Sequence, residues 1–164
     1  MPMNDVVDEA YSSGNPTSTG VPLIPAPTLP PWEEGYVDVG TTLATVGQLV
    51  VKKAAATNTG GAQAQVSATA NQALMRGEFG IVTKAAPSAQ AATGVMLQRG
   101  TVQALCTTTS TAIAVGTLLS ADGAGNLTPA PTTPTPGQIL ARAYGTLTTS
   151  TSTPTLVLVM MGGA

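Results

Sequence analysis

The distribution of proline constrains this chain more than any other feature of its sequence. Seven of the thirteen prolines lie within the first 31 residues, and five of these occur in the stretch VPLIPAPTLPPWEEG, residues 21–35. Because proline fixes φ and lacks a backbone donor, this stretch cannot form a helix interior or a central strand. We therefore predict an extended arm, with a reach of about 3.1 Å per residue in polyproline geometry.

The arm is too apolar to be a solvated tail. Burying one of its large apolar side chains would contribute about 1.5–3 kcal/mol, whereas ordering each backbone residue costs about 1–2 kcal/mol. One arm alone therefore gains little, but several arms in a symmetric assembly bind together through multivalency. We predict that the arm binds a neighbouring subunit through Val21, Leu23, Ile24, Leu29, Trp32, Glu33 and Glu34.

Charge and composition change together near residues 35–40. Residues 1–38 contain six acidic residues and no Lys or Arg, whereas the remainder contains two acidic and six basic residues, a net charge of 6 − 2 = +4. We therefore predict an acidic, Pro-rich arm over residues 1–38 and a β-rich domain over residues 39–164. Charge complementarity favours docking of the arm on the body of another copy. The candidate body contacts are Lys52, Lys53, Arg76 and Arg99.

The body divides into short apolar or alternating runs that Gly, Asn, Pro and Ser/Thr clusters separate. This pattern is typical of an all-β sandwich or barrel. A turn is expected at DGAGN, residues 122–126, within a hairpin, and a surface loop at residues 128–137. Residues 57–75 fit a helix or a strand, and we favour a strand or an irregular loop. Further strands are expected at residues 47–54, 77–85, 138–147 and 154–161, and at 94–107, where the strand is bent or interrupted at Gly100.

The residue inventory argues against catalysis. The chain has no histidine, which excludes His-ligated metal sites and His-dependent triads. Cys106 is the one cysteine, and its apolar surroundings indicate a buried small side chain. The body has two carboxylates, and Asp122 sits where a turn favours Asp, so a pair with Glu78 is not expected. We predict no enzymatic activity, no cofactor and no metal.

Nucleic acid and membrane are also disfavoured as partners. The basic residues are scattered, and the body contains only Phe79 and Tyr144 as aromatic residues for base stacking. The longest apolar run, residues 156–161, is far shorter than the about 20 residues needed to cross a bilayer. The acidic N-terminus lacks the basic residues of an export leader. An SH3-type ligand is disfavoured because no basic residue lies beside the PxxP motifs.

The segment AIAVGTLLSADGAGNLTPAP, continuing to PGQILARAYGTLTTSTSTPTLVLVMM, resembles the C-terminal half of the capsid decoration (cement) proteins of tailed phages. The similarity lies in the order of its parts: a start like Ala-Val-Gly-Thr, a small-residue hairpin with Gly-Asn, a Gly-x-Ile-x-Ala-x-Ala motif and a final Val/Leu strand. VGQLVVKKA and RGTVQALC look like the earlier strands of that family. The resemblance covers residues 45–162.

The resemblance implies a compact β-tulip or barrel-like domain without a catalytic site. Proteins of this family are usually trimeric and sit on the outer surface of the expanded capsid, where they clamp neighbouring major capsid proteins. The expected partners are therefore other copies of this chain, adjacent cement subunits and a major capsid protein. The arm lies outside the shared core but suits a protein that reaches across a shell, and we expect residues 21–32 to dock on an adjacent cement subunit or on the capsid floor.

Two other classes fit the Thr- and Gly-rich composition. A trimeric β-domain of a phage tail fibre or baseplate would bind a receptor and occur in few copies. A bacterial surface adhesin module is disfavoured because no export signal is visible. An enzyme is the least favoured class.

Overall fold

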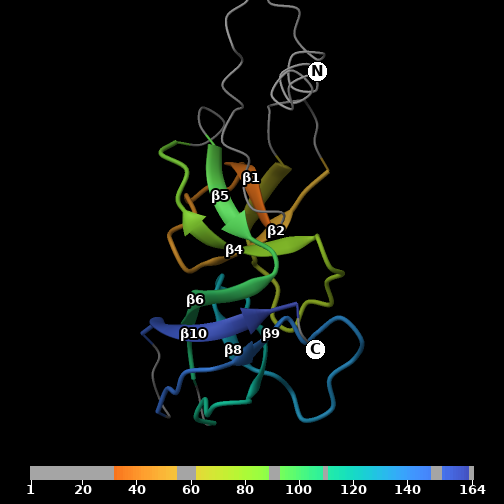
Figure 1. Cartoon of the computed structure of the whole chain (residues 1–164). Helices are drawn as coiled ribbons and strands as arrows, with labels where there is room; N and C mark the ends of the chain where they lie inside the picture. The colour runs from red at the N-terminus through yellow and green to blue at the C-terminus, as the bar shows by residue number, and fades with distance from the viewer. Residues whose placement is uncertain (1–31, 55–61, 89–92, 109–110, 149–152, 163–164) are drawn as a thin grey trace, which may run out of the picture. The chain divides into compact units, whose positions relative to one another are not determined.

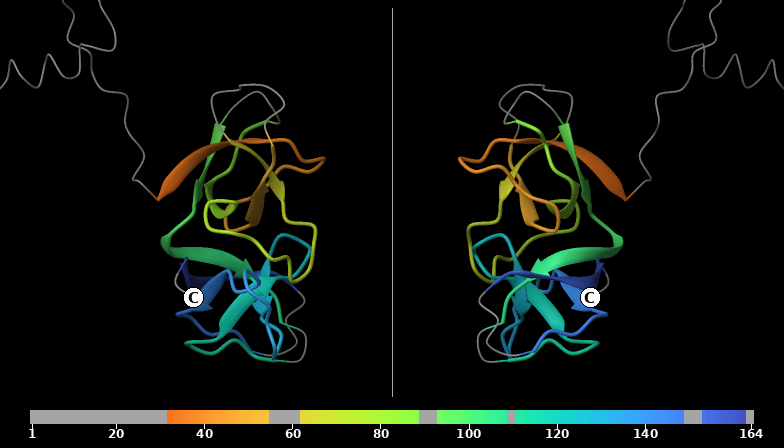
Figure 2. Two further views of the ribbon diagram at one scale, coloured as in Figure 1. Left: turned by 90° about the vertical axis from the view of Figure 1, so that its right-hand side faces the viewer. Right: turned by 90° about the vertical axis from the view of Figure 1, so that its left-hand side faces the viewer.

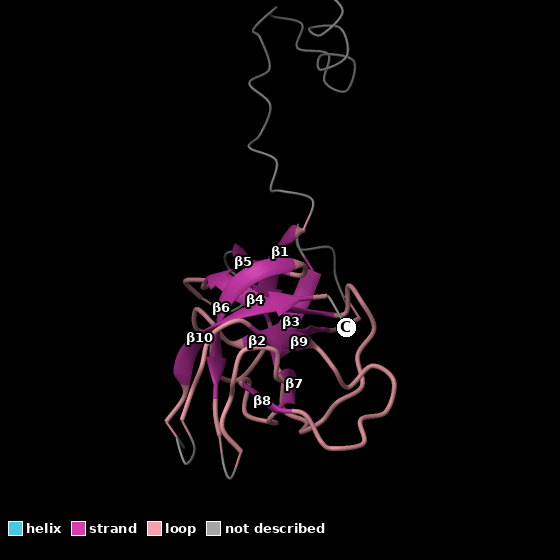
Figure 3. Ribbon diagram, turned by 60° about the horizontal axis from the view of Figure 1, so that its bottom comes forward, coloured by secondary structure: helices cyan, strands magenta, loops and turns pink. Residues whose placement is uncertain are grey.

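The body of the chain is built from strands. The computed structural model describes residues 32–54, 62–88, 93–108, 111–148 and 153–162. Over this part of the chain it contains ten strands and no helix, and Figure 3 shows strands joined by loops. No helix among these residues could therefore cross a membrane. The all-β prediction is confirmed.

The strands are short, as the frequent Gly, Asn and Pro residues require. Their bounds are β1 Glu33–Asp38, β2 Leu49–Lys52, β3 Ala62–Val66, β4 Phe79–Lys84, β5 Thr93–Leu97, β6 Gly100–Cys106, β7 Leu118–Ala121, β8 Leu127–Pro129, β9 Ala141–Ala143 and β10 Thr155–Met161. They form two closed five-stranded sheets, one above the other in Figure 1.

The first sheet closes in the order β1, β3, β2, β4, β5. β1 pairs in parallel with β3 and antiparallel with β5, and this double pairing closes the ring. Its interior is a cluster of buried side chains: Tyr36, Ala44, Val50, Ala64, Val82, Ala86 and Met96. Along β1 the side chains of Glu34, Tyr36 and Asp38 share the inner face, because strand side chains alternate with a period of two.

The second sheet closes in the order β10, β6, β8, β7, β9. β10 and β6 pair along seven residues, which makes them the most extensively paired strands of this sheet. β7 and β8 form the expected antiparallel hairpin around the turn at residues 122–126. Gly125 in this turn has a positive φ of 82° and packs against Val66 of the first sheet, so a side chain there would meet both strain and a clash.

One apolar core joins the two sheets. Leu49, Ile81 and Leu97 lie on the outer face of the first sheet and pack with the interior of the second. β2, β4 and β5 therefore bury both of their faces, and Leu49 and Val50 on β2 enter different clusters. A backbone hydrogen bond also connects the two sheets, because Leu49 N donates to Gly125 O at 2.8 Å. Figure 2 shows the turn of the second sheet reaching the first.

Most expected strands occur at or close to their predicted positions. The segment at 94–107 is interrupted after Leu97, and Gly100, with a φ of 106°, begins β6. The ambiguous interval 57–75 supplies β3, with irregular structure after it. The strand expected at 138–147 is limited to Ala141–Ala143, because the chain turns at Tyr144 and Gly145, whose amides both donate to Leu158 O.

The body begins earlier than the sequence predicts. Contacts divide the chain into Met1–Pro30 and Pro31–Ala164, so β1 belongs to the second unit and not to an arm ending at residue 38. β1 is held there because Tyr36 and Val37 are buried and the Asp38 carboxylate accepts from Gly40 N at 2.8 Å and Ala44 N at 2.6 Å. The extended arm itself lies outside the described residues.

Moving this boundary changes the charge argument. Three of the six acids assigned to the arm, Glu33, Glu34 and Asp38, belong to the body. The body from residue 31 then carries a net charge of 6 − 5 = +1, and residues 1–30, with Asp5, Asp8 and Glu9, carry −3. The contrast in sign persists, but it is smaller than the sequence division at residue 38 predicts.

Candidate partner-binding site

A hollow with aromatic and basic walls lies beside the start of the first strand. Its volume is about 260 Å³, and it is lined by Trp32, Arg76, Gly77, Gln98, Arg99 and Gly162. Trp32 directly precedes β1, and its carbonyl accepts from Gln98 N at 2.8 Å. Arg99 occupies the reversal between β5 and β6, and Arg76 the turn before β4, where Met75 N donates to Glu78 Oε2 at 2.7 Å. The hollow thus joins four separate segments, the fourth being Gly162 directly after β10.

The side chains of this hollow face solvent. Trp32 is 46% exposed, and Arg76 and Arg99 are exposed. Across the part of the chain that the structure describes, the one ion pair joins Lys52 and Glu34, so neither arginine is paired with a carboxylate there. A guanidinium is always charged and carries five donors. The hollow can therefore bind an acidic or carbonyl-rich partner against the Trp32 ring.

A second, apolar hollow adjoins the first and shares Arg76 and Gly162 with it. Its volume is about 450 Å³; buried Leu74, Phe79 and Leu140 line it with Ile139, and the exposed loop Pro134–Gly137 forms its rim. The loop is fixed by a hydrogen bond from Leu74 N to Gly137 O at 2.9 Å. Together the two hollows form what we call the Trp32 groove.

The structure separates the predicted contact residues into two groups. Trp32, Arg76 and Arg99, which the sequence assigned to the arm and to the body, line one hollow. Glu34 and Lys52 instead pair with each other inside the body, where Gln98 Nε2 also donates to Glu34 Oε2.

The remaining predicted contacts lie elsewhere. Glu33 is half-buried on the face of β1 opposite to Glu34, and Lys53 is exposed just after β2. Neither lines the Trp32 groove. The arm contacts Val21, Leu23, Ile24 and Leu29 lie outside the described residues.

An apolar stripe covers the outer face of β10. Leu156 and Leu158 are 48% and 42% exposed, while the alternate residues Val157 and Val159 are buried inside the sheet. Met160 lies on the same outer face, and Tyr144 lies beside it, with its hydroxyl 3.6 Å from Met160 Sδ. We call these four residues the β10 stripe: Tyr144, Leu156, Leu158 and Met160.

Sequence reasoning missed the β10 stripe, although the run LVLVMM contained its signal. A strand that is apolar at every position has two apolar faces, and both need covering. The run indicates a buried strand, and in the structure only one face is covered by the body. The apolar residues at the alternate positions of this run, on the outer face of β10, therefore indicate a surface that a partner could cover.

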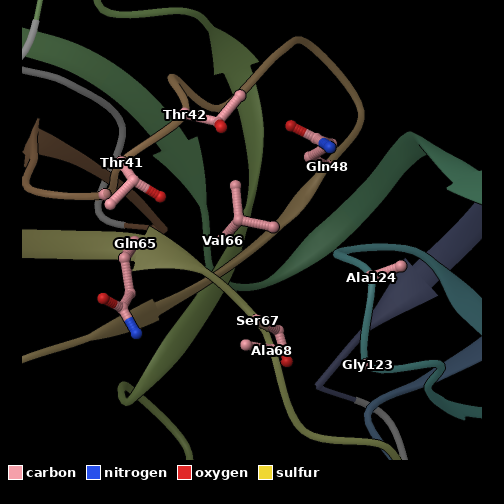
Figure 4. A pocket seen from close by; sticks show the side chains of 10 residues that line it. Thr41, Thr42, Gln48, Gln65, Val66, Ser67, Ala68, Gly123 and Ala124 are labelled. Carbon is pink, nitrogen blue, oxygen red and sulfur yellow. The ribbon is translucent and has the colours of Figure 1, made fainter.

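A third hollow lies where the 122–126 turn meets the first sheet (Figure 4). Its volume is about 350 Å³, and it is lined mainly by hydroxyl, amide and small side chains, among them Thr41, Thr42, Gln48, Gln65 and Ser67. No titratable side chain lines it. This hollow can hydrogen-bond a neutral group but offers no charge with which to select or transform one.

The residues considered for chemistry have structural roles. Asp122 organises the turn: its carboxylate accepts from Ala124 N at 2.7 Å and from Asn126 N at 2.9 Å, which confirms the turn interpretation. Cys106 is buried, and burial together with the nearby Asp122 charge raises the pKa of its thiol to about 12. Among the described residues, no three His, Cys, Asp or Glu side chains gather as metal ligands.

Comparisons with known proteins add no assignment. No protein-family model matches the chain, and no curated protein matches it significantly. The resemblance to tailed-phage decoration proteins therefore stays a prediction from the residues quoted above.

Proposed function

We propose that this protein is a structural subunit that decorates and stabilises the outer surface of an expanded phage capsid. In this proposal the body clamps neighbouring major capsid proteins, other copies of the chain surround it as a homotrimer, and the arm docks on adjacent subunits. The observation that carries the proposal is the β10 stripe, a row of apolar side chains on the outside of a closed sheet.

The stripe has the properties of an interface core. A closed sheet has no free edge for strand pairing, so a partner must contact its outer face or the loops at its ends. Clustered exposed apolar side chains of this kind mark interaction sites, and Tyr and Met are enriched in interface cores. β10 is paired with β6 on one side and β9 on the other, which holds the stripe in one geometry.

The remaining surface also suits an assembled protein. Charged residues make up 9% of the chain, and small and hydroxyl side chains cover most of the described exterior. Few charges leave little repulsion or desolvation cost when copies pack side by side. A compact body joined to an arm of 30 residues can contact several neighbours, since an extended arm of this length reaches about 90 Å.

The first test is the molar ratio of this protein to the major shell protein in purified source particles, measured by quantitative mass spectrometry. A ratio near one to one is expected for a protein that covers the lattice. A ratio of a few per cent would favour the tail-fibre or baseplate alternative, and absence from particles would reject both.

The second test addresses the stripe. Leu158→Ser removes an exposed apolar side chain without opening the core, so the fold should be retained. We expect binding to undecorated shells to weaken by about tenfold or more, the loss that 1.4 kcal/mol produces. Lys84→Ser, an exposed change on the first sheet, is the matched control. Equal binding by both variants would contradict the role of the stripe.

A further inference from the structure

We propose that the Trp32 groove of one copy binds the Pro-rich segment 21–31 of a second copy, as a polyproline ligand held by aromatic and arginine side chains. This inference rests on the proposed function, because it requires copies that lie side by side. The proposal names the surface that binds the arm, and the groove residues that carry it all lie in the described body.

The shape and lining of the groove suit a polyproline segment. Such segments bind to shallow, aromatic-lined grooves, because the extended helix is already formed and little order is lost on binding. Here Trp32 is half-exposed at the mouth, and Phe79 and Ile139 line the adjoining apolar hollow. The hollows, of about 260 and 450 Å³, share Arg76 and Gly162 in their linings and so lie next to each other.

The arginines complete the recognition. A polyproline helix has no internal hydrogen bonds, so its carbonyl groups need donors from outside. Arg76 and Arg99 offer several N–H donors each, and no described carboxylate competes for them. The first 30 residues carry a net charge of −3 and no basic residue, so nothing in the arm sequence repels the two cations.

This polarity reverses that of an SH3-type complex. There a basic residue beside the PxxP motif meets an acidic groove, and the absence of such a residue argued against an SH3 partner for this arm. In this chain the groove is basic, segment 21–31 is uncharged, and the acids of the arm, Asp5, Asp8 and Glu9, lie upstream of it, so charge acts on the approach of the arm and the prolines supply the contact. Charge attraction would then steer the encounter between copies.

The position of Trp32 favours a second copy over the chain's own arm. Trp32 forms the groove mouth and is preceded directly by Pro30 and Pro31. Proline fixes φ and disfavours the α region for the residue before it, so a sequence with two consecutive prolines disfavours a tight reversal of this segment into its own groove. At about 3.1 Å per residue the segment can instead reach a neighbouring body.

Disulfide trapping between two full-length variants tests the inference. One chain carries Ala26→Cys in the arm, which keeps all the apolar arm residues, and the other carries Thr135→Cys on the exposed groove rim. Native Cys106 is fully buried with a raised thiol pKa, so it does not compete for oxidation in the folded protein. The control partner carries Lys84→Cys, an exposed position that does not line the groove.

We expect the Ala26→Cys and Thr135→Cys chains to cross-link at least tenfold faster than the pair with Lys84→Cys. Adding Arg76→Glu and Arg99→Glu to the Thr135→Cys chain should lower that rate severalfold, whereas Arg142→Glu, an exposed charge reversal on β9, should not. To cover other binding registers, Thr28→Cys replaces Ala26→Cys in a parallel mixture. The proposal would be overturned if each arm cysteine cross-linked to Thr135→Cys and to Lys84→Cys at the same rate.

Docking of the chain's own arm is distinguished in the same experiment. A single chain with both Ala26→Cys and Thr135→Cys, diluted until copies rarely meet, would close an internal disulfide if its own arm occupied the groove, and that result would also overturn the proposal. The particle ratio is independent of trapping. A ratio near one to one with no trapping refutes the groove alone, and trapping with no protein in particles refutes the proposed function alone.

Discussion

The two closed sheets have the same number of strands but different interiors. The first encloses a small cluster around Tyr36, Val50 and Met96, and polar groups lie on the same inner face of β1 on either side of Tyr36. The second encloses a cluster that continues into the outer face of the first through Leu49, Ile81 and Leu97. The second sheet therefore completes its core with side chains that the first sheet supplies.

This difference separates the two candidate surfaces. The residues of the β10 stripe belong to the second sheet and the loop beside it, and Leu156 also lies next to Gly47, which leads into β2. The Trp32 groove lies at the junction, because Trp32 precedes the first sheet, Arg99 links the sheets and Ile139 leads into β9. A substitution that loosens the packing between the two sheets should consequently change the shape of the groove more than that of the stripe.

The largest expected effect on stability concerns the position at which the arm ends and the body begins. Deleting residues 1–31 removes none of the ten described strands, so we expect a folded body whose thermal midpoint moves by less than about 4 °C, the shift of roughly 1 kcal/mol. Deleting residues 1–38 removes β1, which pairs with both β3 and β5, and we expect loss of the cooperative transition. Thermal unfolding of the two truncated proteins, followed by circular dichroism, measures this difference. Equal transition midpoints would mean that β1 does not belong to the cooperative body.

The shared core predicts a large effect that reaches both sheets. Ile81 is fully buried in the cluster that joins them. Ile81→Ala should lower the free energy of unfolding by about 2–5 kcal/mol. Because the core is continuous, calorimetry should record one transition at a lower temperature. Two separate transitions would mean that the sheets unfold independently.

The turn at the junction predicts a smaller effect when it is measured as the difference between two glycine substitutions. Gly116→Ala, at a φ of 91° with open space around it, should cost about 1–2 kcal/mol from backbone strain. Gly125→Ala has similar strain and also brings its Cβ to Val66 Cγ1, so we expect a further cost of about 1–3 kcal/mol. Urea unfolding of both variants measures the difference, and equal losses would show that the turn does not press on the first sheet.

The smallest expected effect concerns the ion pair inside the first sheet. The Lys52 side chain is 26% exposed and that of Glu34 is 37% exposed, so solvent screens their attraction. Lys52→Met should therefore cost about 0.2–1 kcal/mol in urea unfolding. Lys53→Met, at the exposed neighbouring position, should cost nothing measurable. A loss of several kcal/mol on Lys52→Met would mean that the pair, and not the apolar cluster, holds the first sheet closed.

Local signals were enough to predict most strands, because Gly, Pro and Asn mark their ends and apolar runs mark their centres. β1 was missed because EEGYVD follows directly on the prolines and carries three acids, which placed it with the arm. Its inclusion depends on pairing with β3 and β5, which are distant in sequence. The extent of β9 likewise depends on contacts of Tyr144 and Gly145 with β10.

The candidate site was only partly predictable. Trp32, Arg76 and Arg99 were each expected to contact partners, from apolarity in one case and charge in the others. That they line one hollow follows from the turn before β4 and the reversal before β6, which bring them to the same end of the first sheet. The pairing of Glu34 with Lys52 needed the closed ring, since no local pattern links β1 to β2.

The double pairing of β1 has a mechanical consequence. β1 is hydrogen-bonded to β5 on one side and to β3 on the other, and a force along its axis would load both sets of bonds. Such a load shears the hydrogen bonds of both neighbours together and does not unzip them in turn. Since the rate of forced unfolding depends on the barrier to leaving the native state, the strand next to the arm is the one suited to carry tension into the body.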